Sequence, residues 1–283
     1  FVYHNEVGAI GITTMDIKRV SITAADQWRQ VSASAPFSPR AGHQISSLAD
    51  GTVILTGGED ESGVSGEAWR WLPMKCPDGI MDTNRELNCA GLQQNQLQVS
   101  GGESIRCQLD PHGPGRWMRL PSAWTPRFGH QMVRLDDYKV VMMGGYSGCF
   151  LNDAHVWEQV DYTVTVLPCS QEFMGAWGPL QGHDNNIDVE NLWNPRYGMS
   201  LTQIPDVGLD RKGVMLMLGG LSVENGCELG SDATYMQDLW CYENDRWVLV
   251  SQSAPWSERF YLSVVPSGNA TVVVLGGYDK FMR

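Results

Sequence analysis

Apolar and polar positions follow a strand-like pattern along the whole chain. Short continuous apolar runs, such as VMLML at residues 214–218 and TVVVL at 271–275, are typical of strands that are covered on both faces. Other segments alternate large aromatic residues with other side chains, as at Trp69 and Trp71. No run approaches the ~18 apolar residues of a membrane-spanning helix. The pattern therefore predicts an all-β protein.

The strands belong to a repeat that occurs four times. Its opening, Pro-Arg-x-Gly-His, precedes a polar turn and an apolar run that stops at a pair of glycines. The first glycine follows the arginine by 17 positions in three copies and by 23 in the third, where the polar stretch PDVGLDRKG takes up the difference. Such regular recurrence predicts one structural unit per copy. The arginine and first glycine of the copies are Arg40 and Gly57, Arg127 and Gly144, Arg196 and Gly219, and Arg259 and Gly276.

Each complete copy is predicted to form four antiparallel strands. The first follows the arginine, the second is the apolar run, and an acidic residue after the glycine pair opens an aromatic third strand, as in DAHVW of the second copy. The fourth strand has a Trp-x-x-apolar pattern at Trp117 and Trp247, with Val164 and Leu167 in that place in the second copy. A tryptophan is large enough to fill the gap between adjacent sheets.

Most of the 11 tryptophans hold a repeat position, which core packing explains. Trp177 and Trp193 have no such position, so they are candidates for exposed contacts. The repeated arginines are expected to brace neighbouring units against one another.

The succession of Arg-x-Gly-His, apolar run, Gly-Gly, Asp-x-Trp and Trp resembles the kelch repeat over nearly the whole chain. The third and fourth copies depart from it, with Met199 and Leu262 in place of the histidine. The resemblance implies a β-propeller of four-stranded antiparallel blades. The expected segments are a half blade 14–33, a blade 38–121 with a cysteine-containing insertion 73–112, a blade 126–168, an insertion 169–191, a blade 195–251 and a half blade 257–279.

The chain thus holds three full blades and two half blades. The two halves could pair and close a four-bladed ring. Kelch propellers more usually have about six blades, so we expect a segment of a larger propeller. The chain starts at Phe1 rather than Met, which fits a processed product or a piece of a longer chain.

The net charge and the cysteines limit the kinds of partner and the cellular compartment that we expect. A net charge of −12 argues against nucleic acid and anionic membranes as partners, because both require clustered cations. None of the seven cysteines forms a CxxC pair, so disulfides in an oxidising compartment are favoured over a zinc site; reduced thiols in the cytosol remain an alternative. A glycosylation sequon begins at Asn269 in a predicted hairpin tip. The disulfide candidates are Cys76, Cys89, Cys107, Cys149, Cys169, Cys227 and Cys241.

Catalytic chemistry finds little support in the sequence. No histidine pair has metal-ligand spacing and no GxSxG motif is present, so we expect no catalytic residue, metal or other cofactor. Galactose oxidase, with its kelch-like propeller and copper site, keeps a secreted propeller enzyme open as an alternative. A glycine pair is followed by Glu59, Asp60 and Glu61. The alternatives for these residues are acid/base groups, calcium ligands and a solvated acidic loop, and the solvated loop is favoured.

The sequence therefore favours a non-catalytic protein-binding module in an extracellular or cell-surface protein that acts in adhesion or assembly. Its partners would be other proteins, including copies of itself, with no nucleic acid and no membrane insertion. The alternative is a cytoplasmic scaffold or substrate adaptor. Loops at the ends of rigid strands carry recognition, so the expected contact residues are Glu59, Asp60, Glu61, Tyr146, Phe150, Trp177, Trp193, Glu224, Asn225, Tyr278 and Asp279.

Overall fold

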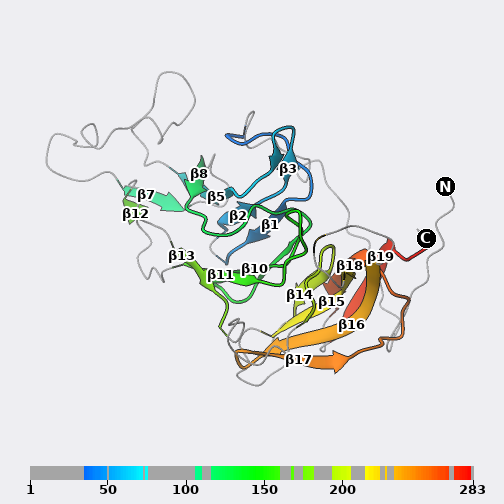
Figure 1. Ribbon diagram of the computed structural model, residues 1–283. Coiled ribbons are helices and arrows are strands. Elements are labelled where there is room, and N and C mark those ends of the chain that lie inside the picture. Colours follow the sequence, from blue (N-terminus) through cyan, green and yellow to red (C-terminus); the bar gives the residue numbers. More distant parts are fainter. Residues whose placement is uncertain are drawn as a thin grey trace, which may run out of the picture.

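The described part of the chain consists of strands and loops, without a helix (Figure 1). None of it contains a helix with the length and apolar character of a membrane span. The expectation of an all-β protein is confirmed for these residues. The computed structural model describes residues 35–49, 51–72, 74–75, 106–109, 116–159, 167–168, 175–181, 193–204, 214–223, 227, 233–267 and 271–281.

Three four-stranded antiparallel sheets follow one another along the chain, and a two-stranded fourth sheet ends it. The first sheet contains β1 (Gln44–Ser47), β2 (Val53–Thr56), β5 (Ala68–Leu72) and β8 (Arg116–Leu120). The second contains β9 (Gln131–Arg134), β10 (Lys139–Met143), β11 (Ala154–Glu158) and β13 (Ala176–Pro179). The third contains β14 (Ser200–Gln203), β15 (Met215–Val223), β16 (Ala233–Glu243) and β17 (Arg246–Ser251), and the fourth contains β18 (Phe260–Pro266) and β19 (Val272–Tyr278).

Two smaller sheets lie outside this series. β3 (Glu59–Asp60) and β4 (Gly63–Val64) form a short hairpin after the first glycine pair. β6 (Met74–Lys75), β7 (Arg106–Leu109) and β12 (Leu167–Pro168) form a three-stranded sheet. Two of its strands come from the expected cysteine-containing insertion, so part of that insertion has regular structure.

The fourth strand of the second sheet is not where the sequence pattern placed it. Leu167 lies in β12, which pairs with β7, and Val164 is outside the described residues. The edge of the sheet is formed by β13, in which Trp177 pairs with Trp157 of β11. Trp177 supplies the bulk that the position requires, because its ring packs 5.7 Å from that of Trp157 and 4.6 Å from that of Trp124. The expected insertion 169–191 therefore contains a strand of the sheet.

The apolar second strands of the first three sheets are largely buried on both faces, as their continuous hydrophobicity predicted. The expectation is wrong for the TVVVL run in β19, where Val273 and Leu275 are 37% and 46% exposed. In β10, Val140 and Met142 pack against the first sheet, whereas Val141 and Met143 pack against the third. Successive side chains of a strand point to opposite faces, so a strand between two neighbouring sheets needs apolar residues at every position.

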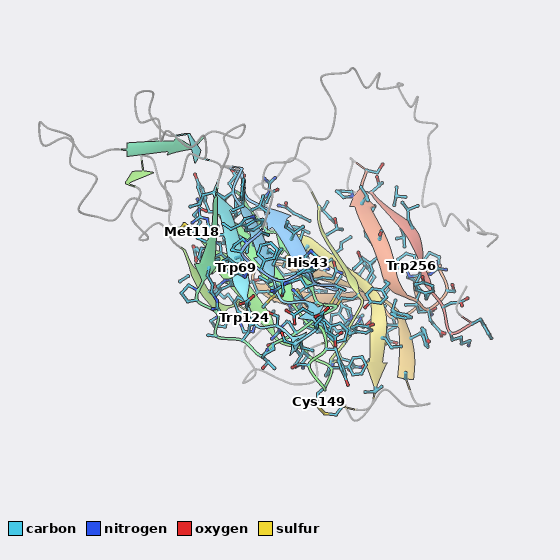
Figure 2. All side chains as sticks on the ribbon, turned by 90° about the horizontal axis from the view of Figure 1, so that it is seen from above. His43, Trp69, Met118, Trp124, Cys149 and Trp256 are labelled. Atoms are coloured by element: carbon cyan, nitrogen blue, oxygen red, sulfur yellow. A yellow bond between two sulfur atoms is a disulfide. The ribbon has the colours of Figure 1, made fainter. Side chains whose placement is uncertain are left out.

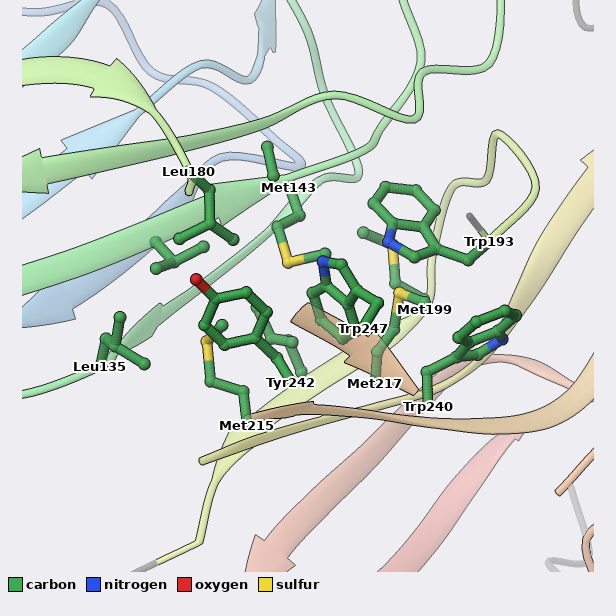
Figure 3. Close-up of a cluster of buried hydrophobic side chains, with 13 residues drawn as sticks. Leu135, Met143, Leu180, Trp193, Met199, Met215, Met217, Trp240, Tyr242 and Trp247 are labelled. Atoms are coloured by element: carbon green, nitrogen blue, oxygen red, sulfur yellow. The ribbon is translucent and has the colours of Figure 1, made fainter. Parts of the chain in front are cut away.

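The largest core lies between the second and third sheets (Figure 3). Met143 of β10 meets Met215 and Met217 of β15 and Met199, which directly precedes β14, and Trp193 belongs to the same cluster. Unbranched methionine side chains adapt to the irregular space that large aromatic rings leave. The cluster comprises Leu135, Val141, Met143, Ala154, Leu180, Trp193, Met199, Leu201, Met215, Met217, Trp240, Tyr242 and Trp247.

The first strands of the four sheets also contact one another in chain order, β1 to β9, β9 to β14 and β14 to β18. The view from above shows the same succession of sheets, from His43, which directly precedes β1, to Trp256 beside the fourth sheet (Figure 2). The first strands of successive sheets thus lie side by side.

His130 links the first two sheets and makes stability depend on pH. Its ring is fully buried, with Nε2 2.8 Å from Oγ1 of Thr56. Burial, together with the nearby charge of Arg127, lowers the pKa of His130 from 6.5 to about 3. The unfolded chain therefore binds a proton between these pH values that the folded chain excludes, so stability is full above pH 6.5 and falls as the pH decreases toward 3.

We expect the unfolding free energy to fall by ~1 kcal/mol per pH unit more in the wild type than in His130→Gln between pH 6 and 5. Urea unfolding at pH 7, 6 and 5 measures this difference. His43→Gln, at the same repeat position but with a half-buried ring, is the matched control variant. Equal slopes in the wild type and His130→Gln would contradict the prediction.

Candidate protein-binding surface

In the first three copies, an arginine clamp fixes the base of the loop that follows the glycine pair. Nη1 of Arg127 donates to the carbonyl of Gly144 at 3.0 Å, and both terminal nitrogens pair with the carboxylate of Asp153 at 2.6 Å. The residues on either side of the loop, the glycine and the acid, are thereby held together. Arg196 does the same with Gly219 and Asp238, and Arg40 with Gly57 and Glu67.

In each clamp, the positive charge of a buried arginine is paired with the negative charge of an acidic side chain. The side chain of Arg127 is fully buried. Burial opposes ionisation of Asp153, but the hydrogen bonds and charge of Arg127 outweigh it and lower the pKa of that carboxyl. A buried charge pair with fork-shaped geometry holds its two partners in one arrangement.

The arginine side chains act within their own sheets, whereas we expected them to brace neighbours. At these repeat positions, the backbone rather than the arginine side chain joins neighbouring sheets. The N–H of Gly145 donates to the carbonyl of Arg196 at 2.9 Å, and Gly220 donates to Arg259 in the same way. A side chain at Gly144 would meet the Arg196 carbonyl at 2.8 Å, so the close approach requires glycine.

A cluster of eight aromatic residues, three of which directly follow a repeat arginine in the chain, is called the aromatic surface here. Tyr197 is at its centre, with its ring 5.7 Å from Phe128, 6.1 Å from Phe150 and 5.2 Å from Tyr261. Most of these contacts are edge to face, which aromatic quadrupoles favour. The aromatic surface comprises Phe128, Tyr146, Phe150, Tyr197, Tyr235, Phe260, Tyr261 and Tyr278.

The aromatic surface is built by one repeat position and by the loops. Phe128, Tyr197 and Phe260 each occupy the x of Arg-x-Gly, and two of them bridge to the residue just after a glycine pair, Phe128 to Tyr146 and Tyr197 to Leu221. Sequence reasoning missed these three residues. The available signal was that x is aromatic in three of the four copies.

Tyr261 is the most unusual member. It stands where the other copies have glycine and keeps the left-handed backbone of those glycines, with φ of 54°. Its hydroxyl donates to that of Tyr197 at 2.7 Å, and its side chain is 42% exposed. A bulky residue with this backbone costs ~1 kcal/mol or more, so an exposed ring is presented here at a conformational cost.

A disulfide joins two of the loops. Cys149, after the second glycine pair, is bonded to Cys227, after the third. Cys149 lies at the margin of the packed side chains (Figure 2). Both cysteines are among the seven disulfide candidates that the sequence offered. Cys241, a third candidate, lies half-buried in β16.

The expected contact residues fall into different places. Tyr146, Phe150 and Tyr278 belong to the aromatic surface, and Asp279 follows it directly in the chain. Phe150 is only 5% exposed and therefore supports the surface from below.

Trp193 was expected to be exposed, and this is wrong: its side chain is 1% exposed within the core between the second and third sheets. Trp177 is likewise a packing residue of β13, half-buried against the core shared by the first two sheets. Both large rings stabilise the sheets from which the loops extend.

The acidic residues 59–61 form part of the β3–β4 hairpin. Hydrogen bonds from the Ser38 and Ser62 hydroxyls lower the pKa of Asp60 to about 2. Glu59 and Glu61 are exposed to solvent. Within the described ranges, no group of three His, Cys, Asp or Glu residues has the geometry to hold a metal ion.

Several residues that the sequence singled out lie outside the described residues, or are described by their backbone alone. They include two loop residues, the glycosylation sequon and four cysteines: Glu224, Asn225, Asn269, Cys76, Cys89, Cys107 and Cys169.

Comparison with known proteins gives a partial match. No family model matches the chain. It is 26% identical over 141 residues to the putative adagio-like protein 2 and to the adagio-like protein 1 of Oryza sativa subsp. japonica, and 26% identical over 145 residues to the adagio-like protein 3 of the same species. These matches cover 42–44% of this chain. The chain spans only 22% of the length of each of these curated relatives.

Proposed function

We propose that the chain is a kelch-type β-propeller module that binds another protein through the aromatic surface. The similarity to adagio-like proteins, which are of the kelch-repeat class, supports the repeat assignment. Four-stranded antiparallel sheets that stack face to face, with their first strands side by side, are the arrangement that propeller blades have.

The observation that carries the binding role is the aromatic surface itself. Tyr261 and Tyr278 are 42% and 51% exposed, and the ring of Tyr261 packs 5.2 Å from that of Tyr197, which directly follows the buried clamp residue Arg196. Exposed aromatic rings on a rigid support are typical centres of protein interfaces, because they bury a large area at a small cost in conformational entropy. The proposal includes no catalytic step.

Two settings follow for this binding module. The adagio-like similarity favours a scaffold or substrate adaptor inside the cell. The Cys149–Cys227 disulfide favours the second candidate, a secreted or cell-surface protein, because structural disulfides are rare in the cytosol. The mass of the native protein before and after reduction distinguishes them: unbonded Cys149 and Cys227 would exclude the secreted setting.

Binding is tested with a double variant on the aromatic surface, Tyr261→Asn with Tyr278→Ser. Asparagine is chosen because it tolerates the left-handed backbone of position 261. A protein captured from native extract by the wild type is purified and titrated against both chains by calorimetry. We expect Kd to rise at least ~10-fold in the variant, as loss of an aromatic hot spot does.

The matched control is Val250→Ser, which changes an equally exposed apolar residue on β17. This variant should bind with the wild-type Kd. If the control and the double variant bind equally well, the aromatic surface is not the binding site.

A further inference from the structure

The Cys149–Cys227 disulfide joins the second and third repeat copies beside the aromatic surface. Cys149 lies in the loop of residues 146–152, between Gly145 and the clamp residue Asp153. Cys227 lies between β15 and β16. The two cysteines are 78 positions apart in the chain, so the bond fixes segments of two different copies to one another.

The disulfide is adjacent to the residue that supports the aromatic surface from below. Phe150 directly follows Cys149, is 5% exposed and belongs with Leu221 of β15 to one buried apolar cluster. Its ring lies 5.3 Å from that of Tyr146 and 6.1 Å from that of Tyr197. The disulfide therefore restrains the backbone that positions Phe150 beneath two tyrosines of the surface.

The backbone contacts of the loop do not depend on the sulfur atoms. The N–H of Ser147 donates to the carbonyl of Cys149 at 2.9 Å, and the N–H of Leu151 donates to that of Gly145 at 2.9 Å. The carbonyl of Leu151 accepts from the N–H of Arg196, in the third copy, at 3.0 Å. Opening of the disulfide would therefore loosen the loop locally and leave the two sheets together.

Reagents in solution can reach the disulfide. Cys227 is exposed and Cys149 is half-buried, at the margin of the packed side chains in Figure 2. Exposed disulfides are typically the labile or regulatory ones, whereas structural disulfides resist reduction by glutathione. A disulfide inside the cell is usually transient or redox-sensing, so a reversible bond is consistent with both cellular settings considered for this chain.

We propose that the Cys149–Cys227 disulfide is a redox switch for the aromatic surface, opened by small thiols of the glutathione class. The proposal rests on the binding function proposed above. A thiolate of the reductant attacks one sulfur, forms a mixed disulfide and releases the other cysteine, which takes up a proton. A second reductant thiolate attacks the mixed disulfide and releases the remaining cysteine in the same way. Two reductant thiols are oxidised to one disulfide, and their two electrons reduce the protein disulfide to two thiols.

The reduced protein presents a less rigid aromatic surface. Without the disulfide, Phe150 is held by its packing and by the backbone contacts of its loop, so the rings of Tyr146 and Tyr197 lose part of their support. A surface that becomes ordered only on binding loses affinity, because ordering costs conformational entropy. The oxidised protein therefore binds its partner more tightly than the reduced protein does.

The test is hydrogen exchange of the full chain in oxidised and in reduced glutathione, followed by mass spectrometry of peptides that cover Tyr146–Leu151. We expect the amides of these peptides to exchange at least ~10-fold faster in reduced glutathione. Alkylation of the cysteines before digestion shows whether the Cys149–Cys227 bond is open in each buffer. Peptides that cover β10 should be unchanged, which shows that the protein is folded.

The double variant Cys149→Ser with Cys227→Ser lacks the switch, so its peptides should exchange in both buffers at the rate of the reduced wild type. A difference between the buffers that persists in this variant would overturn the proposal, because another cysteine would then be responsible. Cys241→Ser is the matched control. Cys241 lies half-buried in β16, and this variant should respond to the two buffers as the wild type does.

Two results with the wild type would also overturn the proposal: a Cys149–Cys227 bond that stays closed in reduced glutathione, and equal exchange with the bond open and closed. Hydrogen exchange is measured without a partner, so a failed switch is distinguished from a failed binding site. Where the partner binds the aromatic surface, calorimetry should give a Kd at least ~3-fold higher for the reduced protein, and equal Kd values would overturn control of binding by the disulfide.

Discussion

Arg127→Ala is expected to lower the free energy of unfolding by about 3–5 kcal/mol, the largest effect of any single substitution proposed for this chain. The substitution removes a fully buried guanidinium and leaves the carboxylate of Asp153 without the charge that keeps it ionised. It also leaves the carbonyl of Gly144 without its side-chain donor. Urea denaturation at pH 7 measures the change.

Arg119→Ala is the control for loss of an ion pair as such. Arg119 lies 3.2 Å from Glu67, but its side chain is 66% exposed, so its removal should cost less than ~1 kcal/mol. If both variants lose the same stability, the clamp is no stronger than a surface ion pair.

Gly144→Ala is expected to cost about 3 kcal/mol for a different reason. The backbone of Gly144 has φ of 60°, which costs an alanine ~1 kcal/mol. In addition, the new Cβ would lie 2.6 Å from Cε of Met199 and 2.8 Å from the carbonyl of Arg196. The methionine can move, but the carbonyl is held by Gly145, so the second and third sheets must separate slightly.

Gly148→Ala isolates the backbone contribution. Gly148 has φ of 79°, and a Cβ added to it would have no heavy atom within 4 Å, so alanine there should cost only ~1 kcal/mol. Thermal unfolding of both variants gives the comparison. A loss at Gly148 as large as that at Gly144 would show that crowding between the sheets contributes nothing.

The repeat made most of the strands predictable. Apolar runs bounded by an arginine and a glycine pair identified the first two strands of each sheet, and the acid after the glycines identified the third. These signals are reliable because the clamp needs the arginine, the glycine and the acid together. The same contact therefore determines the residue type at all three positions.

The fourth strand of the second sheet was missed because loop length hid the pattern. Trp177 and Leu180 have the spacing of Trp117 and Leu120, and Leu180 is 3% exposed. This spacing identifies β13 as the fourth strand. The loop that precedes it is longer than the corresponding loop of the third copy, so the prediction placed the fourth strand at Leu167 instead. Spacing along the chain says little where a loop can absorb residues.

Trp193 also had a repeat position that was not used. It stands three residues before Arg196, as Trp124 stands before Arg127 and Trp256 before Arg259. The guanidinium of Arg196 lies 6.0 Å from the ring centre of Trp193. The tryptophan therefore packs beside the clamp, and its burial follows from this position.

The aromatic surface was harder to predict. Phe128, Tyr197 and Phe260 are about 60–70 residues apart in the chain, and only the stacking of three sheets brings their rings together. A single copy of the motif does not predict this cluster, because the rings that contact an aromatic residue at x come from the other copies.

The clamp separates the length of a loop from the structure of the sheet beneath it. Seven residues stand between Gly145 and Asp153, whereas 17 stand between Gly220 and Asp238, yet the two arginine–carboxylate pairs have distances of 2.6 and 2.7 Å. Since the closure point is the same, insertions between these residues leave the fold unchanged. The loops of such a protein are free to diverge in evolution, and they are equally suitable as grafting sites for new binding sequences.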